Sequence, residues 1–490
     1  MSNLFSFNAR TGESTGEPLA TSSAAQIDAA VVAAHHAFGD WGRSSGAQRA
    51  TLLRHLADRL EADRESLVAL ADLETALGPV RLNGELDRTT FQLRRFADIA
   101  QRGEPFAVLD DPAVAGAPPA GHPAMQLHRM PLGPVAMFAA SNFPFAFSVL
   151  GGDTASALAA GCPVVVKAHP GHPALSRQVF AIAERSVQAL GLPAGLIGMV
   201  QGAGIDVGVL LIRHPLIAAG AFTGSTRGGA ALQAEANARA RPIPFYGELG
   251  SINPLVALPP VLSARAAELA GTLAASITLG CGQFCTNPGL LVLVDGPETE
   301  AFVPQLAQAL GEIQPHPMLT AGMRKVFDAG VQAFVGAGAT PLVQGQGAGL
   351  APGPQLLQVS AQRFIETHAL REEVFGPASL IVRCADLAQA QDVLHAVEGS
   401  LTVTLWGADD DTAEHRALVR AAMQIAGRVL FSGVPTGVAV TAAQQHGGPW
   451  PASTAPMTTS VGDAAIDRFL RPVCVQDAPA WLLERSGRPC

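Results

Sequence analysis

The chain has 490 residues, of which 48% are hydrophobic and 15% charged, and its formal net charge is −9. This length predicts two or three domains with large cores, and the acidic balance argues against nucleic acid or an anionic membrane as a partner. Three features predict a cytoplasmic protein. The six cysteines are scattered along the chain, and no apolar run approaches the ~20 residues of a membrane span. The N-terminus has no signal-peptide features.

The first half of the chain is predicted to begin with helices and to continue as an α/β unit. The clearest helical periodicity covers residues 52–74, and the Pro-, Gly- and Ala-rich stretch 110–123 is predicted to be a connector. From residue 130 onward, short apolar runs alternate with Ala-rich helical stretches, and the predicted strands are 134–140, 163–168, 196–202 and 217–224. Buried strands that alternate with helices are typical of a parallel sheet covered on both faces.

The pattern restarts after residue 250, which predicts a second α/β domain with a boundary near that position. A long helix over 264–280 leads into a glycine-rich loop, and the predicted strands around it are 253–258, 290–294, 378–383, 401–407 and 428–433. The fold class predicted for the whole chain is therefore α/β.

The glycine-rich loop GCGQFCTNPG, residues 280–289, contains Cys281 and Cys285. A zinc-type site needs three or four ligands, and no second Cys or His pair accompanies these two cysteines, so we expect no metal. Two interpretations remain open. Free cysteines are among the most buried residues, but glycines let a ligand approach the backbone closely, and a thiol needs only modest help to act as a nucleophile.

Such help could come from Glu248, the acidic residue of the stretch FYGELG at 245–250. A glutamate of this kind is either a surface turn residue or partly buried, and its neighbours Phe245 and Tyr246 favour burial. Burial raises the pKa of a carboxyl and makes it a competent general base near neutral pH. The spacing alone does not show that Glu248 and Cys285 meet.

Two glycine-containing segments are candidates for cofactor binding. VQGAGIDVG at 200–208 follows a predicted strand and loosely resembles a dinucleotide loop, although a plain tight turn explains it equally well. Gly224, Ser225 and Gly229 lie where a predicted strand turns into a helix, and the free N–H groups of a helix N-terminus suit a pyrophosphate.

Taken together, the motifs of this chain resemble the ordered signature set of the aldehyde dehydrogenase superfamily over essentially its whole length. They are SNFPF (141–145), VVKA (165–168), FTGST (222–226), ELG (248–250), GQFCTNPG (282–289) and EEVFGP (372–377). Two later segments, HGGPWPAST (446–454) and SVGDAAIDRFLRPV (460–473), are similar to the branch with α-ketoglutaric semialdehyde (2,5-dioxopentanoate) dehydrogenases and NADP-dependent fatty aldehyde dehydrogenases.

The resemblance implies a role for each residue of the catalytic motifs. Cys285 matches the nucleophile, Glu248 the general base, and Asn142 the residue whose amide donates to the oxyanion, while Cys281 would be a packed neighbour. Attack on an aldehyde, loss of hydride to a nicotinamide and hydrolysis of the resulting thioester would give a carboxylic acid.

The resemblance also implies a dinucleotide site. Lys167 matches the lysine at the adenine ribose, the segment with Gly224, Ser225 and Gly229 the pyrophosphate site, and Glu373 with Phe375 the nicotinamide ribose site. NAD-preferring members commonly carry Glu three residues after the lysine, where this chain has Pro170. Without that anion, repulsion of a 2′-phosphate is relieved, so we expect NADP in preference to NAD.

The domain organisation that the resemblance implies has three parts. A Rossmann-type cofactor domain would comprise residues 1–118 and 137–247, a catalytic domain 248–453, and a small β bridging element 119–136 with 454–490. The bridging element predicts a homodimer or homotetramer.

The substrate is the least determined part of the prediction. Phe145, Phe147, Phe284 and Trp450 suggest an apolar funnel for medium aliphatic or aromatic aldehydes, although each could equally be core. The tail resemblance favours α-ketoglutaric semialdehyde, whose carboxylate needs a cationic partner; Arg468 and Arg471 are candidates by position alone. We expect the semialdehyde, oxidised to 2-oxoglutarate. The alternatives are a broad-specificity enzyme, a coenzyme-A-acylating enzyme, an inactive scaffold and a Cys/His hydrolase, although His446 shows no motif partner.

Overall fold

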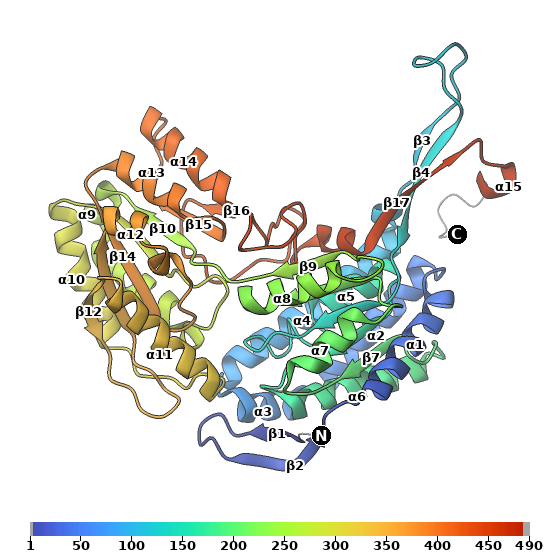
Figure 1. Ribbon diagram of the computed structural model, residues 1–490, viewed down its shortest axis with the longest axis horizontal. Coiled ribbons are helices and arrows are strands. Elements are labelled where there is room, and N and C mark those ends of the chain that lie inside the picture. Colours follow the sequence, from blue (N-terminus) through green and yellow to red (C-terminus); the bar gives the residue numbers. More distant parts are fainter. Residues whose placement is uncertain (1–2, 484–490) are drawn as a thin grey trace.

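A five-stranded parallel sheet forms the centre of one half of the molecule, in the computed structural model that describes residues 3–483 (Figure 1). Its strand order is β7 (Ile197–Val200), β6 (Val164–Lys167), β5 (Val135–Phe138), β8 (Ala219–Thr223), β9 (Phe245–Glu248). The helices of this half are α1 (Ala24–Trp41), α2 (Gly46–Ala62), α3 (Arg64–Thr75), α4 (Pro79–Arg102), α5 (Gly152–Ala160), α6 (Pro173–Ala189), α7 (Ile205–Arg213) and α8 (Thr226–Asn237).

Alternate residues of the inner strand β6 point to opposite faces of this sheet, and both faces are covered. Val164 and Val166 pack in the core cluster that includes α2, α4 and α6, whereas Val165 packs in a second cluster with α1 and α7. Side chains that alternate along a strand and find helices on both sides explain why the predicted runs were continuously apolar.

A seven-stranded sheet forms the other half of the molecule. Its order is β12 (Thr340–Gln344), β13 (Gln355–Ser360), β14 (Ala378–Cys384), β11 (Leu290–Val294), β10 (Pro254–Ala257), β15 (Ser400–Trp406), β16 (Ala426–Leu430), with only the β12–β13 pair antiparallel. Its helices are α9 (Pro259–Thr278), α10 (Pro297–Gly311), α11 (Ala321–Gly336), α12 (Ala361–Glu366), α13 (Leu387–Ala396) and α14 (Ala413–Ile425). The expected second α/β unit is thus present, although β12 and β13 were not predicted.

A three-stranded antiparallel arm projects from the first half (Figure 1). It consists of β3 (Leu109–Asp111), β4 (Met125–Pro131) and β17 (Leu470–Gln476), and the short helix α15 (Ala480–Leu483) follows. The arm therefore begins before residue 119, and β5 starts at Val135 inside the segment expected to bridge. Residues 484–490 of the expected tail lie outside the described residues.

Two helix predictions for the N-terminal part are wrong. The periodic stretch 52–74 is divided at Asp63 between α2 and α3, because an Asp side chain competes with helical hydrogen bonding and favours helix ends. The chain also starts with an antiparallel hairpin of β1 (Asn3–Phe7) and β2 (Ser14–Ala20). Within the described residues, none of the helices combines the length and the apolar content needed to cross a membrane.

Candidate active site between the two sheets

Glu248 and Cys285 come from different halves of the molecule and meet where the two sheets face each other. Glu248 is the last residue of β9, and Cys285 lies in the loop between α9 and β11. The segment after β16 crosses between them. Its backbone pairs with β9 through Leu249 N–H to the Ala452 carbonyl at 2.8 Å and Thr454 N–H to the Gly247 carbonyl at 3.0 Å. This pairing brings His446 to the site.

His446 connects the thiol to the carboxylate. Its Nε2 lies 3.5 Å from Cys285 Sγ and 3.1 Å from Glu248 Oε1, and the Ser460 hydroxyl donates to Glu248 Oε2 at 2.9 Å. The side chains of His446 and Glu248 are only 1% and 2% exposed, so their interaction is shielded from water and strong. The sequence shows no motif partner for His446, and the structure supplies two contacts through residues distant in the sequence.

The electrostatics of this cluster differ from the expectation for Glu248. Burial by itself raises the pKa of this carboxyl, but the charge and hydrogen bond of His446, together with the hydrogen bonds of Ser460 and Cys285, outweigh burial and lower it. Burial and then the carboxylates of Glu248 and Glu373 raise the pKa of the Cys285 thiol well above its ordinary value. The thiol is thus held protonated beside a base that can accept its proton.

Asn142 lies beside the nucleophile loop, in the turn that follows β5. Its side-chain amide donates one hydrogen bond to the Gln283 carbonyl at 3.0 Å, and the second N–H of that amide is available to a ligand. Behind it, Arg81 donates to the Asn142 carbonyl at 2.6 Å. The structure therefore places Glu248 at Cys285 and Asn142 beside the loop that carries Cys285, and the catalytic roles of the three residues stay predictions.

Asn253 fixes the backbone of the nucleophile loop and was not predicted. Its buried amide donates to the carbonyls of Ser251, Cys285 and Asn287 at 3.1, 2.8 and 2.9 Å, and its φ is +46°. Asn tolerates this left-handed conformation better than other side chains. In the sequence, Asn253 is only the first residue of the predicted strand 253–258, followed by Pro254.

Cys281 points away from Cys285 and behaves as a packed side chain. Its thiol donates to the His316 carbonyl at 3.0 Å, and burial raises its pKa to about 12. The Cys285 Sγ, His446 Nε2 and Glu248 Oε1 atoms all lie within 4.8 Å of one another. Such a set could also hold a metal ion, which the spacing of the cysteines did not suggest.

Comparison with known proteins identifies the family of the chain. The aldehyde dehydrogenase family profile matches residues 4–449. The chain belongs to the aldehyde dehydrogenase family. It is 44% identical, over 98% of its length and 92% of the relative's, to α-ketoglutaric semialdehyde dehydrogenase 2 of Azospirillum brasilense. It is 39% identical, over 99% and 93%, to an α-ketoglutaric semialdehyde dehydrogenase of Acinetobacter baylyi. An NAD-dependent aldehyde dehydrogenase structure from Sinorhizobium meliloti shares the fold, with a TM-score of 0.82 and 23% identity over 98% of this chain and 92% of that one.

Enzymes of this family use NAD(P), and a dinucleotide fits the turn between β8 and α8. Ser225 is the N-cap of α8 and accepts from the Gly228 N–H at 3.2 Å, and both Gly224 and Ser225 are exposed. The free N–H groups of the first turn can therefore reach a phosphate. A Cβ on Gly229 would lie 2.1 Å from Leu249 Cδ2, so this glycine allows α8 to pack against the chain. The segment 200–208 leads into α7, with Gly204 as its N-cap.

Lys167 lies at the end of β6, and burial lowers its pKa to about 8. None of the ion pairs among residues 3–483 involves it. The neighbouring His169 has its pKa lowered well below the ordinary value by burial and by the charges of His172 and Lys167, so it is neutral. A buried amine without a carboxylate partner fits an anionic ligand.

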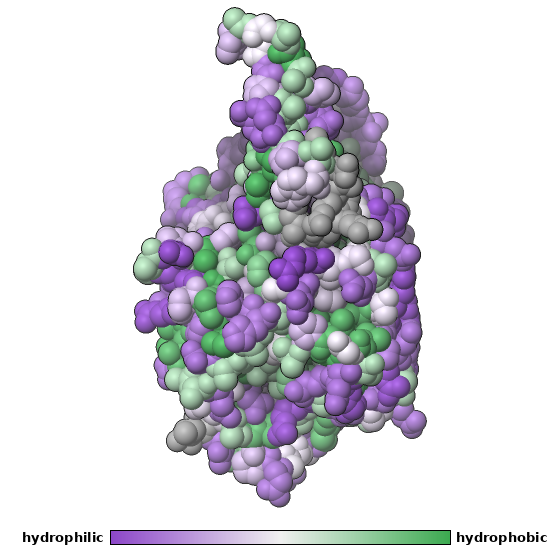
Figure 2. All heavy atoms as spheres, turned by 90° about the vertical axis from the view of Figure 1, so that its right-hand side faces the viewer, coloured by the Kyte–Doolittle hydropathy of each residue, from purple (hydrophilic) through white to green (hydrophobic). Residues whose placement is uncertain are grey.

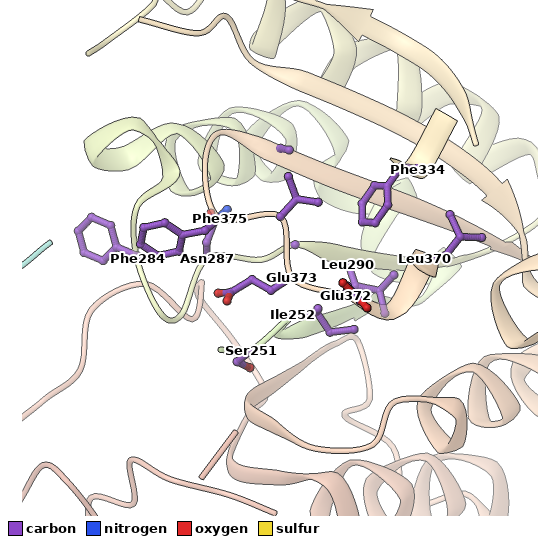
Figure 3. A pocket seen from close by; sticks show the side chains of 13 residues that line it. Ser251, Ile252, Phe284, Asn287, Leu290, Phe334, Leu370, Glu372, Glu373 and Phe375 are labelled. Carbon is purple, nitrogen blue, oxygen red and sulfur yellow. The ribbon is translucent and has the colours of Figure 1, made fainter. Parts of the chain in front are cut away.

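Glu373 and Phe375 line a pocket together with Asn287 and Phe284, next to the nucleophile (Figure 3). Burial raises the pKa of Glu373 to about 7. A Cβ on Gly250 would lie 2.5 Å from Glu373 Oε2. The Glu373 carboxylate therefore packs directly against the backbone of Gly250, where any side chain would overlap with it. A carboxylate held in this way can accept hydrogen bonds from a sugar hydroxyl.

The predicted substrate-pocket residues do not all reach the site. Phe147 and Phe284 do, joined by Phe143, whose ring centroid lies 5.3 Å from Phe147 and 5.2 Å from Phe284. Phe145 packs instead in the core with α4, and Trp450 is 47% exposed at the surface. Residues 144–151 form turns, and α5 starts only at Gly152.

Of the two arginines suggested for a substrate carboxylate, Arg468 lines a small pocket with Glu248 and His446, and Arg471 does not. Arg468 is buried and forms an ion pair of 2.7 Å with Asp153. Arg471 is exposed on β17 of the arm. Arg468 is thus already paired, and Arg471 lies on the arm. Neither guanidinium is free to bind a substrate carboxylate at Cys285.

Proposed function

We propose that this aldehyde dehydrogenase oxidises α-ketoglutaric semialdehyde to 2-oxoglutarate with NADP. The observation that carries the substrate is the near full-length identity of 44% and 39% to two enzymes with this activity in their names. The observation that supports the chemistry is the Cys285–His446–Glu248 cluster. A broad-specificity enzyme is the second candidate, favoured by the aromatic lining of Phe143, Phe147 and Phe284.

Deprotonation of Cys285 begins the reaction. The thiol has a raised pKa, and the imidazole of His446 lies between it and Glu248. We infer that the thiol proton passes to the His446–Glu248 pair as sulfur adds to the aldehyde carbon. Pairing with Glu248 stabilises the imidazolium that this transfer creates, as a buried carboxylate does beside other catalytic histidines.

The negative charge that develops on the aldehyde oxygen faces the Asn142 amide and the Cys285 backbone N–H. Donors of this kind typically lower the barrier by ~3–4 kcal/mol. NAD(P), when bound, supplies the hydride acceptor. Loss of hydride from the adduct carbon leaves a thioester on Cys285. Once the His446–Glu248 pair has released the thiol proton to solvent, it can take a proton from the water that attacks the thioester, and it returns this proton to the Cys285 thiolate as the acid leaves.

The preference for NADP rests on the region around Lys167. No carboxylate follows at position 170, where Pro170 stands, and His169 is neutral. A 2′-phosphate would therefore meet a cationic amine and no anion. Removal of a repelling carboxylate and retention of the lysine favour the phosphorylated cofactor.

We assign cofactor binding to the half with the five-stranded sheet, the nucleophile to the half with the seven-stranded sheet, and homodimer or homotetramer formation to the arm. Exposed apolar side chains support the last assignment: Leu109, Val114 and Leu127 are 62%, 49% and 39% exposed. Figure 2 shows hydrophobic surface along the projecting strands. The five cysteines of the described residues are free thiols, which suits the cytoplasm as the compartment.

The test is a comparison of kcat/KM for α-ketoglutaric semialdehyde, hexanal and benzaldehyde, each with NADP and with NAD. We expect at least tenfold preference for the semialdehyde and for NADP, measured as NADPH or NADH absorbance without coenzyme A. A tenfold preference for hexanal would instead establish the broad-specificity enzyme.

Two cysteine variants control this measurement. Cys285→Ala should abolish aldehyde oxidation while the fold and NADP binding remain, whereas Cys281→Ala should retain most activity because its thiol points away from the site. Activity of Cys285→Ala within tenfold of the wild type would remove this residue from the mechanism.

A further inference from the structure

Two arginines from opposite halves of the molecule converge on one short loop beside the nucleophile. Arg88 lies on α4 and donates a hydrogen bond to the Val438 carbonyl. Arg428 lies on β16 and donates to the carbonyls of Gly437 and Pro435 at 3.1 and 2.6 Å. The segment 435–438 therefore holds both guanidinium groups in one place.

This place is close to the reacting sulfur. Both guanidinium groups are near enough to Cys285 to interact with its charge, and Arg88 opposes the other groups that raise the Cys285 pKa. The Arg88 guanidinium also lies 5.7 Å from the ring centroid of Phe147, which belongs to the aromatic lining of the site. Two positive charges thus lie close to Cys285, and that of Arg88 also lies beside the aromatic lining.

Both arginines carry buried N–H groups without a partner. Arg88 Nε and Nη2 and Arg428 Nε make no hydrogen bond among the described residues, and neither arginine is in an ion pair there. Glu85 interacts with Arg88 through its charge, but the two form no ion pair in the described residues. The Oε1 of Glu85 accepts from the Phe145 and Ala146 N–H groups, and its buried Oε2 has no hydrogen-bond partner. Unpaired buried charge destabilises a fold unless a ligand compensates for it.

Arg81 differs from these two residues. Its guanidinium stacks on the rings of Phe284 and Phe143, 4.6 and 5.1 Å from their centroids, and donates to the Asn142 carbonyl. Arg81 therefore positions the aromatic lining and the Asn142 turn.

We propose that Arg88 and Arg428 bind the carboxylate of the substrate while its aldehyde carbon lies at Cys285. The inference rests on the proposed function, because it assumes an aldehyde that carries a carboxylate. Only four carbon–carbon bonds separate the two groups in α-ketoglutaric semialdehyde, so a carboxylate anchored beside Cys285 suits a short substrate. Guanidinium groups bind carboxylates through paired, charge-assisted hydrogen bonds, which the partnerless N–H groups of both residues can supply.

The first test measures selectivity in Arg88→Met and Arg428→Met. The ratio of kcat/KM for α-ketoglutaric semialdehyde to that for hexanal should fall at least 30-fold in each, mainly through a higher KM for the semialdehyde. Arg88→Lys should lose less than Arg88→Met, because it keeps the charge. Arg420→Met, an exposed arginine on α14, is the matched control and should keep the wild-type ratio.

The second test does not depend on the folding of variants. Phenylglyoxal, which modifies arginines, is applied to the wild-type enzyme with and without 2-oxoglutarate, and modified residues are identified by mass spectrometry. Protection of Arg88 and Arg428 is expected.

The possible results distinguish a failure of the proposed function from a failure of the proposed carboxylate site. If the wild type shows no preference for the semialdehyde, the proposed function fails. If it does, but both Met variants keep the ratio within threefold, or 2-oxoglutarate protects neither arginine, the carboxylate binds elsewhere and this inference is overturned.

Discussion

Lys167 couples cofactor binding to the protonation of a single buried amine. Burial holds its pKa at about 8, so the amine is charged below pH 8 and neutral above it. A 2′-phosphate, which is largely dianionic above pH 7, binds the charged form and raises the pKa of the amine in the complex. The affinity for NADP should therefore be highest below pH 8 and should fall as the pH rises through 8.

We predict that the Kd for NADP increases by up to about tenfold per pH unit between pH 8 and 9.5, while the Kd for NAD changes less. Isothermal titration calorimetry at several pH values measures both. Lys167→Met should bind NADP weakly and with a flat pH profile, and Lys325→Met, on α11, serves as the matched lysine control. Equal pH dependence for NAD and NADP would show that the 2′-phosphate is bound by other groups.

At the scale of single residues, the sequence allowed us to predict the candidate site residues that lie in short sequence motifs. Cys285, Glu248 and Asn142 each lie in a short motif; Glu248 meets Cys285 in the structure, and Asn142 contacts the backbone of the same loop at Gln283. His446 could not be found in this way, because its contact with Glu248 depends on a distant segment that pairs with β9. The pKa of Glu248 was mispredicted for the same reason: burial was considered without the histidine that opposes it.

The nucleophile loop as an element depends on a close backbone contact at Gly282. Its φ is +65°, and a Cβ there would lie 2.2 Å from the carbonyl oxygen of Gly376, in the loop that carries Glu373 and Phe375. The contact locks the thiol loop against the cofactor-facing loop. Asn287, which donates to the same Gly376 carbonyl at 3.0 Å, reinforces it.

Gly282→Ala should therefore separate the two loops. We expect a loss of about 2–4 kcal/mol in stability, from backbone strain and steric overlap, and at least a 100-fold lower kcat. Calorimetric melting and steady-state kinetics measure these effects. Gly271→Ala on α9 is the control: its Cβ would meet nothing within 4 Å, and the change should stabilise the helix by about 0.5–1 kcal/mol. Full activity in Gly282→Ala would show that the loops move independently.

Element predictions succeeded where periodicity was long and failed where one residue or a tertiary contact decided the outcome. Strands such as β6 and β11 are continuous apolar runs and were found. Asp63 ends α2 within a periodic stretch, and the turn over 144–151 is held by Glu85 of α4, through the Phe145 and Ala146 N–H groups. Neither effect is visible in local hydrophobic patterning.

At the scale of the whole molecule, the sequence predicted two α/β units and a small β element, and the structure contains two such halves and an arm (Figure 1). The order of strands within the seven-stranded sheet could not be predicted, because β10 pairs with β15 across a long sequence separation. The division of the site between the halves follows from this topology: Asn142 and Glu248 belong to one half, Cys285 and Glu373 to the other.

Because the site is divided between the two halves, enzyme activity depends on how tightly the halves are held together. The main core clusters of the two halves are separate except where Leu319 and Met323 of the second half pack against the first, and interfaces between such bodies are weaker than the cores themselves. In increasing urea, we expect activity to disappear at a concentration at which the far-ultraviolet circular dichroism is still native, because a small separation parts Cys285 from Glu248 while both sheets persist. Coincident loss of activity and helical signal would mean that the halves unfold as one cooperative unit.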